Sequence, residues 1–197
     1  MLIVKDNIKD VTRSLTRVQR RQIPFATVGA LNSTAFAAQR EIKRQLPRKF
    51  ILRNRWTESG VQVRKANKRN MTATVLMGRG REYMARQEEG GIKRPHGQHL
   101  AVPSAVRRSK RQKITKAKRP SAVLAKPRTF KATIGGQPGI YQRRGRKRGP
   151  LKLLYALERQ VRIRPRFGFK KTAGGVAKNT FNRHFRVSLE RGLRTAR

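Results

Sequence analysis

The stretch formed by residues 90–157 contains 19 Lys and Arg residues and no Asp or Glu. Its cations have no carboxylate within the stretch to pair with, so they must face solvent or a polyanionic partner. The excess extends over the whole chain, in which 51 Lys and Arg face 9 Asp and Glu for a formal net charge of +42. A chain with this charge repels itself strongly. We expect nucleic acid as the partner, because phosphates supply dense negative charge and counterion release drives binding.

The most basic part of this stretch is residues 104–127. Only Val106, Ile114, Val123 and Leu124 offer apolar anchors there, and a like-charged segment of this kind does not fold alone. The sequence therefore predicts an extended basic arm over 104–127 that becomes ordered on a partner. Residues 1–103 and 128–197 together are predicted to form a single α+β domain.

A β-meander is predicted directly after the arm. Phe130, Ala132 and Ile134 alternate with polar residues, as in a half-buried strand. Glycines and prolines supply the turn that follows. A second strand is predicted from Ile140. The apolar run over 151–157 suits a strand buried on both faces or a short helix, and a strand is favoured because turns lie on both sides. The loop between these two strands carries a cluster of cations and should face solvent.

The arm and this loop carry the cations that are predicted to contact nucleic acid or an acidic partner. They are Arg107, Arg108, Lys110, Arg111, Lys113, Lys116, Lys118 and Arg119 in the arm, and Arg143, Arg144, Arg146, Lys147 and Arg148 in the loop. The sequence has no zinc-finger spacing, no basic zipper and no aromatic-studded strand for stacking RNA bases. We therefore expect contact with phosphates without reading of bases.

Helices are predicted on both sides of the β-rich region, because apolar residues recur there at spacings of three and four. The predicted helices cover residues 6–20, 24–45 and 176–195. Pro24 is expected to separate the first two helices, and Pro47 is expected to end the second. Gly174 and Gly175 predict a break before the last helix.

Residues 60–78 change to the alternating pattern of a β-hairpin. Trp56 precedes the hairpin and is expected to be a buried core anchor under the helix. The hairpin and residues 129–164 are expected to form one antiparallel sheet, in which 161–163 is an edge strand that stops at Pro165. The predicted fold class is α+β, with N-terminal and C-terminal amphipathic helices packed on a small antiparallel β-sheet.

Nothing in the sequence indicates catalysis, so the protein is predicted not to be an enzyme. Its nine acids are scattered, and it has no cysteine for a thiolate or a disulfide. Glu88, His96 and His99 would be the ligands of a metal site, but Pro95 and Gly97 place them on a loop, which is more typical of a surface. No metal and no cofactor are expected. The apolar runs are far shorter than the roughly 20 residues of a spanning helix, so no membrane partner is expected.

Several short motifs resemble those of one known family. The motifs are Glu88-Glu89-Gly90-Gly91, Leu100-Ala101-Val102-Pro103, Gly139-Ile140-Tyr141-Gln142-Arg143, Leu153-Leu154-Tyr155 and Arg162-Ile163-Arg164-Pro165-Arg166-Phe167. In these motifs, and in its order of helix, sheet and helix, the chain outside residues 104–127 is similar to the tail-completion, or minor tail protein Z-like, proteins of tailed bacteriophages.

The resemblance implies a structural protein of the virion, located in the neck or tail and assembled in the host cytoplasm. It implies a homo-oligomeric ring, hexameric or dodecameric, around the DNA path, with non-specific contact to double-stranded DNA. Portal, adaptor or tail proteins would be the neighbours. The Ala-rich helix face formed by Val28, Leu31, Ala35 and Ala38 would suit close packing against the next subunit.

The alternative is a ribosomal protein, or another structural protein that binds RNA without sequence specificity. Such a protein would share the high basic charge, the lack of cysteine and the extended arm. A nuclease or integrase would require clustered carboxylates for metal ions, and the sequence has no such cluster.

Overall fold

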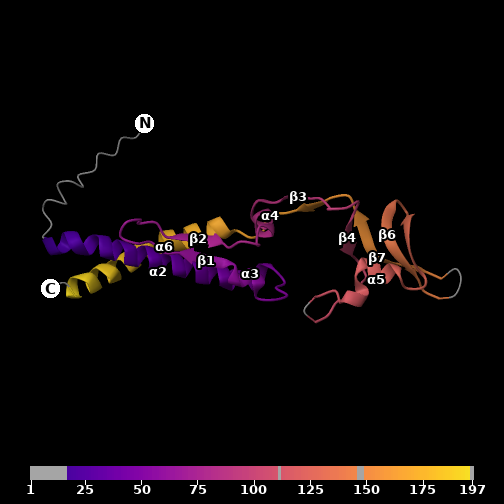
Figure 1. Ribbon diagram of the computed structural model, residues 1–197, viewed down its shortest axis with the longest axis horizontal. Helices are drawn as coiled ribbons and strands as arrows, with labels where there is room; N and C mark the ends of the chain where they lie inside the picture. Colours follow the sequence, from indigo (N-terminus) through magenta and orange to yellow (C-terminus); the bar gives the residue numbers. More distant parts are fainter. Residues whose placement is uncertain (1–16, 111, 146–148, 196–197) are drawn as a thin grey trace, which may run out of the picture. The chain divides into compact units, whose positions relative to one another are not determined.

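The computed structural model describes residues 17–110, 112–145 and 149–195, and its contacts form two compact units. The elements of unit 1 are α2 (Arg17–Lys49) up to Arg48, α3 (Trp56–Ser59), β1 (Val61–Arg64), β2 (Thr74–Met77) and α6 (Phe169–Thr195) (Figure 1). The elements of unit 2 are α4 (Tyr83–Glu89), β3 (Gly91–Lys93), β4 (Leu100–Pro103), the 3-10 helix η1 (Lys116–Lys118), α5 (Pro120–Leu124), β5 (Thr129–Ile134), β6 (Gln137–Arg143), β7 (Leu151–Glu158) and β8 (Val161–Ile163).

The predicted α+β class is confirmed, because an N-terminal and a C-terminal helix pack on small antiparallel sheets. That residues 1–103 and 128–197 form a single domain stays a prediction.

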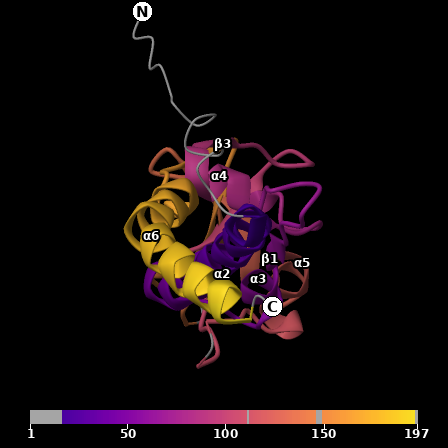
Figure 2. The same ribbon diagram turned by 90° about the vertical axis from the view of Figure 1, so that its left-hand side faces the viewer.

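In unit 1, α2 and α6 run antiparallel. Thr34 Oγ1 in the middle of α2 lies 3.0 Å from His184 Nδ1 of α6. Nearer the start of α2, a Cβ atom on Gly29 would stand 3.0 Å from Ser188 Oγ. The residue number therefore rises along one helix as it falls along the other. Figure 2 shows the two helices side by side.

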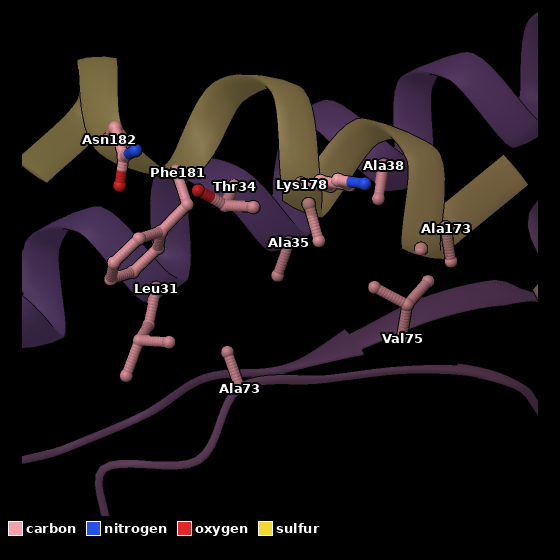
Figure 3. Close-up of a pocket in the computed structure, with 12 residues that line it drawn as sticks. Leu31, Thr34, Ala35, Ala38, Ala73, Val75, Ala173, Lys178, Phe181 and Asn182 are labelled. Carbon is pink, nitrogen blue, oxygen red and sulfur yellow. The ribbon is translucent and has the colours of Figure 1, made fainter. Parts of the chain in front are cut away.

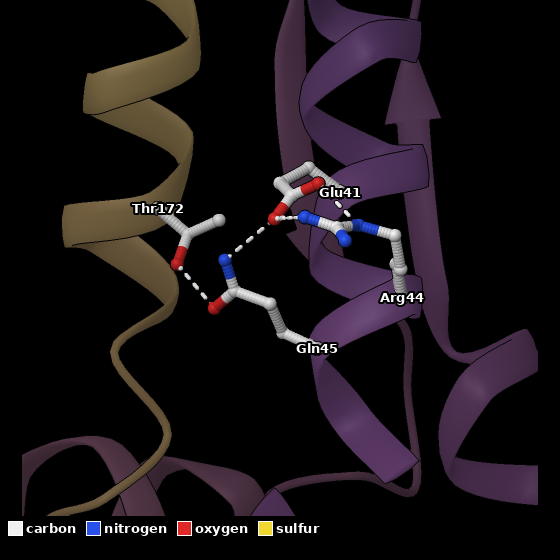
Figure 4. Close-up of polar contacts among 4 residues, drawn as sticks. All are labelled: Glu41, Arg44, Gln45 and Thr172. Atoms are coloured by element: carbon white, nitrogen blue, oxygen red, sulfur yellow. Dashed lines mark hydrogen bonds and ion pairs between the residues drawn. The ribbon is translucent and has the colours of Figure 1, made fainter. Parts of the chain in front are cut away.

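A chain of polar contacts joins the later part of α2 to α6 (Figure 4). Glu41 accepts hydrogen bonds from Arg44 Nε and Gln45 Nε2, both at 2.8 Å, and Thr172 Oγ1 of α6 donates to Gln45 Oε1 at 3.0 Å. The hydrogen bonds from Arg44 and Gln45 lower the pKa of Glu41 to about 2. The carboxylate is therefore ionised at neutral pH and already paired within unit 1.

Helix α2 continues through both of its prolines. The predictions that Pro24 separates two helices and that Pro47 ends the second are therefore wrong. A proline inside a helix loses one backbone hydrogen bond and costs about 3 kcal/mol. Burial of the same helix offsets this cost, since Ala26, Ile42 and Leu46 are all at most 1% exposed.

Two other helix boundaries also differ from the prediction. Residues 17–20 of the first predicted helix belong to α2, and residues 6–16 lie outside the described residues. Helix α6 begins at Phe169 and includes Gly174 and Gly175, so the predicted break there is wrong. Contacts of α6 with α2 before and after these glycines outweigh their low helix propensity.

The predicted hairpin is confirmed, with Val61 of β1 opposite Met77 of β2. Side chains of α2 hold it in place. Gln39 Nε2 donates to Val61 O at 2.7 Å. Asn32 donates to Ala66 O at 3.1 Å and accepts from Ala66 N at 2.7 Å. These bonds seat the hairpin on one face of α2.

Trp56 is 51% exposed, so the prediction that it is a core anchor is wrong. Arg81 lies over its ring, with the guanidinium carbon 3.7 Å from the ring centroid. Arg81 also donates from Nε to Trp56 O at 3.3 Å and from Nη1 to Arg79 O at 2.6 Å. The hairpin and α6 already cover the apolar face of α2, which leaves Trp56 to a cation–π contact at the surface.

Unit 2 contains a four-stranded sheet in the order β4-β7-β6-β5, in which all neighbours are antiparallel. Strands β5, β6 and β7 are the predicted meander. Strand β8 pairs with β3 in a separate two-stranded sheet, and the β1–β2 hairpin belongs to unit 1. The prediction of one sheet from residues 60–78 and 129–164 is therefore wrong. The alternation within a strand predicts which face is buried, but it does not identify the neighbouring strand.

Residues 104–110 and 112–127 pack on the four-stranded sheet, so the predicted extended arm is wrong for these residues. Val106 and Val123 are buried in one core with residues of β6 and β7. The Tyr155 hydroxyl donates to a main-chain carbonyl of η1. A few anchors suffice because the sheet supplies the opposing apolar face, which the segment cannot supply by itself.

Candidate nucleic-acid interface

Three chain segments converge at one end of the four-stranded sheet. Because neighbouring strands are antiparallel, β4 and β6 end where β5 and β7 begin. The register places Arg143 opposite Leu151 and Gln142 opposite Thr129. Residues that follow β4, precede β5 and join β6 to β7 are therefore brought together, although they lie far apart in the sequence.

Exposed cations gather at this end of the sheet, which we call the basic end. The basic end consists of Arg107, Arg108, Lys126, Arg128, Arg143 and Arg144. Within the segments that carry these residues, namely 104–110, 125–129 and 142–145, there is no carboxylate. Their positive charges therefore add to one another instead of being neutralised locally.

Hydrogen bonds fix the positions of several of these cations. Arg143 N donates to Arg128 O at 2.9 Å, and the Arg143 guanidinium lies 5.4 Å from the centroid of the Phe130 ring. Arg108 Nη2 donates to Pro103 O at 3.3 Å, which holds its side chain beside the end of β4. The basic end is therefore attached to the strands themselves.

The core beneath the basic end is closed by Tyr155, which is 1% exposed. Burial raises the pKa of its phenol, and the nearby charge of Arg108 opposes that rise. The protonated phenol donates to Lys118 O, and Lys118 Nζ donates to Arg107 O at 3.4 Å. Tyr155 thus anchors the segment from which Arg107 and Arg108 project.

The opposite end of the sheet has a different chemistry. Glu158, the last residue of β7, lies there and accepts a hydrogen bond from Gln137 Nε2 at 3.3 Å. The β5–β6 turn at that end consists of Gly135 and Gly136, whose φ angles of 58° and 76° favour glycine. The sheet therefore has a cluster of cations at one end, whereas the other end has an uncharged turn and Glu158, which is followed by the exposed Arg159.

The predicted contact residues fall into three groups. Arg107, Arg108, Arg143 and Arg144 belong to the basic end. Lys110, Lys113, Lys116, Lys118 and Arg119 lie on the same covering segment of the sheet, where all but the half-buried Lys118 are exposed. Arg111, Arg146, Lys147 and Arg148 lie outside the described residues.

Two residues of the basic end, Lys126 and Arg128, are not among the predicted contact residues, although Lys126 lies within the predicted arm. The signal that identifies them is the register of the β5–β6 hairpin, which sets Thr129 opposite Gln142. That register places the residues just before β5 beside Arg143. It becomes visible only when both strands are paired, because neither strand encodes it alone.

The helix face predicted to meet a neighbouring subunit lies in unit 1. Ala35 and Ala38 are buried there, whereas Val28 and Leu31 are half-buried. That this face packs against another subunit stays a prediction.

Among the residues that the structure describes, no three His, Cys, Asp or Glu side chains come together as a metal site would require. Glu88, His96 and His99 thus form no ligand cluster. None of the described helices has both the length and the apolar composition needed to cross a bilayer.

Comparison with known proteins found no match, whether with models of protein families, with curated protein sequences or with solved structures.

Proposed function

We propose that this protein is a non-catalytic structural subunit of the neck or tail of a tailed bacteriophage, and that it binds double-stranded DNA without sequence preference. The basic end of unit 2 contacts DNA phosphates or an acidic neighbouring ring. The subunits form a ring around the DNA path, with portal, adaptor or tail proteins as neighbours.

The observation that carries this proposal is the gathering of cations at one end of the four-stranded sheet. Exposed cations from three separate segments meet there, and these segments contain no carboxylate. Like charges repel, so their gathering on one surface costs free energy unless an anion binds there. Phosphates are suitable anions, because each neutralised phosphate releases counterions.

The residue types at the basic end suit phosphate better than bases. Five of its six cations are arginines, whose planar guanidinium matches a phosphate with two hydrogen bonds. Contacts to phosphates position a protein on DNA but carry no sequence information. Such contacts suit a ring through which DNA has to slide.

The location in a virion is supported by the resemblance to tail-completion proteins. All five motifs that carry the resemblance fall within unit 2, at or beside β3, β4, β6, β7 and β8. Imaging of the purified protein by electron microscopy, alone and with neighbouring proteins of the same particle, tests this part of the proposal. We expect closed rings with a central channel, and a persistent monomer in every mixture would contradict it.

A second candidate is an RNA-binding structural protein of the ribosomal type. The observation that favours it is the exposed ring of Trp56 with Arg81 stacked on it at 3.7 Å. Unpaired RNA bases stack on aromatic rings and on guanidinium planes. Trp56 is the sole tryptophan of the chain, so its fluorescence reports directly on such stacking.

The DNA contact is tested by a five-fold variant of the basic end, in which Arg107, Arg108, Arg128, Arg143 and Arg144 are each changed to Gln. Its binding to two unrelated DNA duplexes is followed by fluorescence anisotropy over a range of salt concentrations. The slope of log K against log salt should flatten by about 0.9 for each lost phosphate contact, hence by at most about 4.5. Both duplexes should lose affinity equally.

A matched control removes five positive charges from exposed positions of α6 in unit 1, by changing Lys171, Arg183, Arg186, Arg191 and Arg194 to Gln. Its slope should change by less than about one contact. Equal losses in both variants would mean that net charge, and not the basic end, determines binding. Preference for a structured RNA over duplex DNA, with quenching of Trp56, would favour the second candidate.

A further inference from the structure

Unit 1 contains a groove with a volume of about 600 Å³ between α2 and α6, beside β2 (Figure 3). We call it the α2/α6 groove. Leu31 of α2, Val75 of β2 and Phe181 of α6 form its larger apolar walls. Alanines from all three sides line the rest, with Ala177 exposed on α6 and Ala35 buried on α2. The groove is therefore an open apolar surface on a strongly basic protein.

Hydrogen bonds join the two helices that form the groove. Thr34, which lines it, is bonded to His184 at 3.0 Å. Further along α2, Gln45 is bonded to Thr172 of α6 at 3.0 Å. The two helices are thus joined at both places. The alanine side chains that line the groove between them are short and leave its space unfilled.

The lining has the geometry of two helical ridges. Residues at spacings of three and four on α2 form one ridge, and residues four apart on α6 form the other. The ridges are Leu31, Ala35 and Ala38 on α2, and Ala173, Ala177 and Phe181 on α6. A third helix packs between two such ridges, with its own apolar anchors at i, i+3 or i+4, and i+7.

The charges around the groove determine which helix fits. Lys178 lines it, and Arg40 and Arg183 act electrostatically on His184, which is bonded to the lining residue Thr34. Glu41, the one carboxylate within α2 as the structure describes it, is already paired with Arg44. A long helix of a second copy would bring further Lys and Arg to the groove, because both α2 and α6 are rich in these residues, and it would match the charges there poorly. An occupant with acidic flanks would be attracted.

We propose that the α2/α6 groove binds an amphipathic helix of a different protein, with apolar residues on one face and acidic residues beside them. This contact is separate from the DNA contact, because it uses unit 1 and not the basic end of unit 2. Loss of one contact should therefore leave the other intact.

The test uses a fluorescein-labelled helical peptide of about 15 residues, with leucines at i, i+3, i+4 and i+7 and glutamates on both flanks. A scrambled peptide of identical composition is the reference. Anisotropy should show binding of the helical peptide to the full chain at least about tenfold more tightly than of the scrambled one. Equal binding of the two peptides would overturn the proposal, since charge alone would then explain it.

Two neighbouring glycines of α6 provide a matched pair of variants. Gly174 lines the groove and Gly175 does not, yet both are exposed and a Cβ on either would meet no atom within 4 Å. Leucine favours a helix over glycine at both positions, so both variants should fold. Gly174→Leu should fill the groove and weaken peptide binding at least about tenfold, whereas Gly175→Leu should leave it within about twofold.

Equal effects of the two leucine variants would overturn the proposal. Lys178→Glu should also weaken binding, while Arg194→Glu, a charge reversal near the end of the same helix, should weaken it less. Light scattering tests whether a second copy of this chain occupies the groove instead. If the wild-type chain dimerises and Gly174→Leu alone abolishes the dimer, the groove holds a second copy and the proposal is wrong.

Discussion

The two units differ in the share of small side chains in their cores. In unit 1 the fully buried positions along α2 include Ala26 and Ala30 beside the larger Ile42 and Leu46. In unit 2 the core between the sheet and its covering segment is filled by Ile140, Leu154 and Tyr155. Around Ala26 and Ala30, unit 1 therefore depends on close approach of neighbouring elements, whereas the core of unit 2 is filled by larger side chains.

The difference explains how a segment with so many like charges becomes ordered. Residues 104–127 contribute few apolar side chains, but the large residues of the sheet complete the core for them. The cations of the segment remain at the surface, while its anchors lie inside. In unit 1 the short side chains leave the α2/α6 groove open instead.

The largest expected effect is a loss of stability in the core of unit 2. Tyr155→Ala removes a buried aromatic ring, which should lower the free energy of unfolding by about 3–5 kcal/mol. Hydrogen exchange followed by mass spectrometry should show loss of protection over the sheet and over 104–127, with α2 and α6 little changed. Tyr155→Phe, which loses only the hydrogen bond to Lys118 O, should cost about 1–3 kcal/mol. Continued protection of 104–127 in Tyr155→Ala would contradict this account of the core.

A smaller effect is expected from overfilling unit 1. Ala30 is 0% exposed, so Ala30→Leu should force the surrounding elements apart and cost about 1–3 kcal/mol. Ala177→Leu, at an exposed position of α6, should stay within about 0.5 kcal/mol of the wild type. Thermal unfolding measures both. If Ala30→Leu is as stable as the wild type, unit 1 does not depend on close approach.

The smallest effect is a dependence of unit 1 on pH. Burial lowers the pKa of His184, and the charges of Arg183 and Arg40 lower it further. As pH falls below about 6.5, His184 takes up a proton in the unfolded chain before it does so in the folded chain. The unfolded state then binds more protons, so the free energy of unfolding should decrease from pH 7 towards pH 5.

The variant His184→Gln isolates this effect, since glutamine does not titrate. Its stability between pH 5 and pH 7 should vary less than that of the wild type, as measured by chemical denaturation at each pH. Glu41, with a pKa of about 2 in the folded protein, contributes only at lower pH. An identical pH dependence in the wild type and in His184→Gln would rule out His184 as the cause.

Much of the fold could be predicted from local patterns. The spacing of apolar residues identifies α2 and α6, and alternation identifies the β1–β2 hairpin and the β5–β6–β7 meander. The predicted helix boundaries are wrong at proline and glycine residues. Pro24, Pro47 and Gly174 lie inside helices because tertiary packing outweighs their local preference.

The candidate site could be predicted only in part. The absence of acids over 90–157 indicates the partner chemistry, and it leads to Arg107, Arg108, Arg143 and Arg144. That Lys126 and Arg128 lie beside Arg143 at the basic end follows only from the register of β5 and β6. The exposure of Trp56 could not be predicted, because it follows from the covering of α2 by β1, β2 and α6.

The sequence by itself determined the charge, the types of the main elements and the small size of the residues on α2, because these depend on composition and on neighbours a few positions away. Only the tertiary structure decided that β8 pairs with β3, that residues 104–127 cover a sheet and that cations from three segments meet at one of its ends. These features are contacts between residues far apart in the chain. Their free energy comes from complementary surfaces, and neither surface is visible in the periodicity of a single segment.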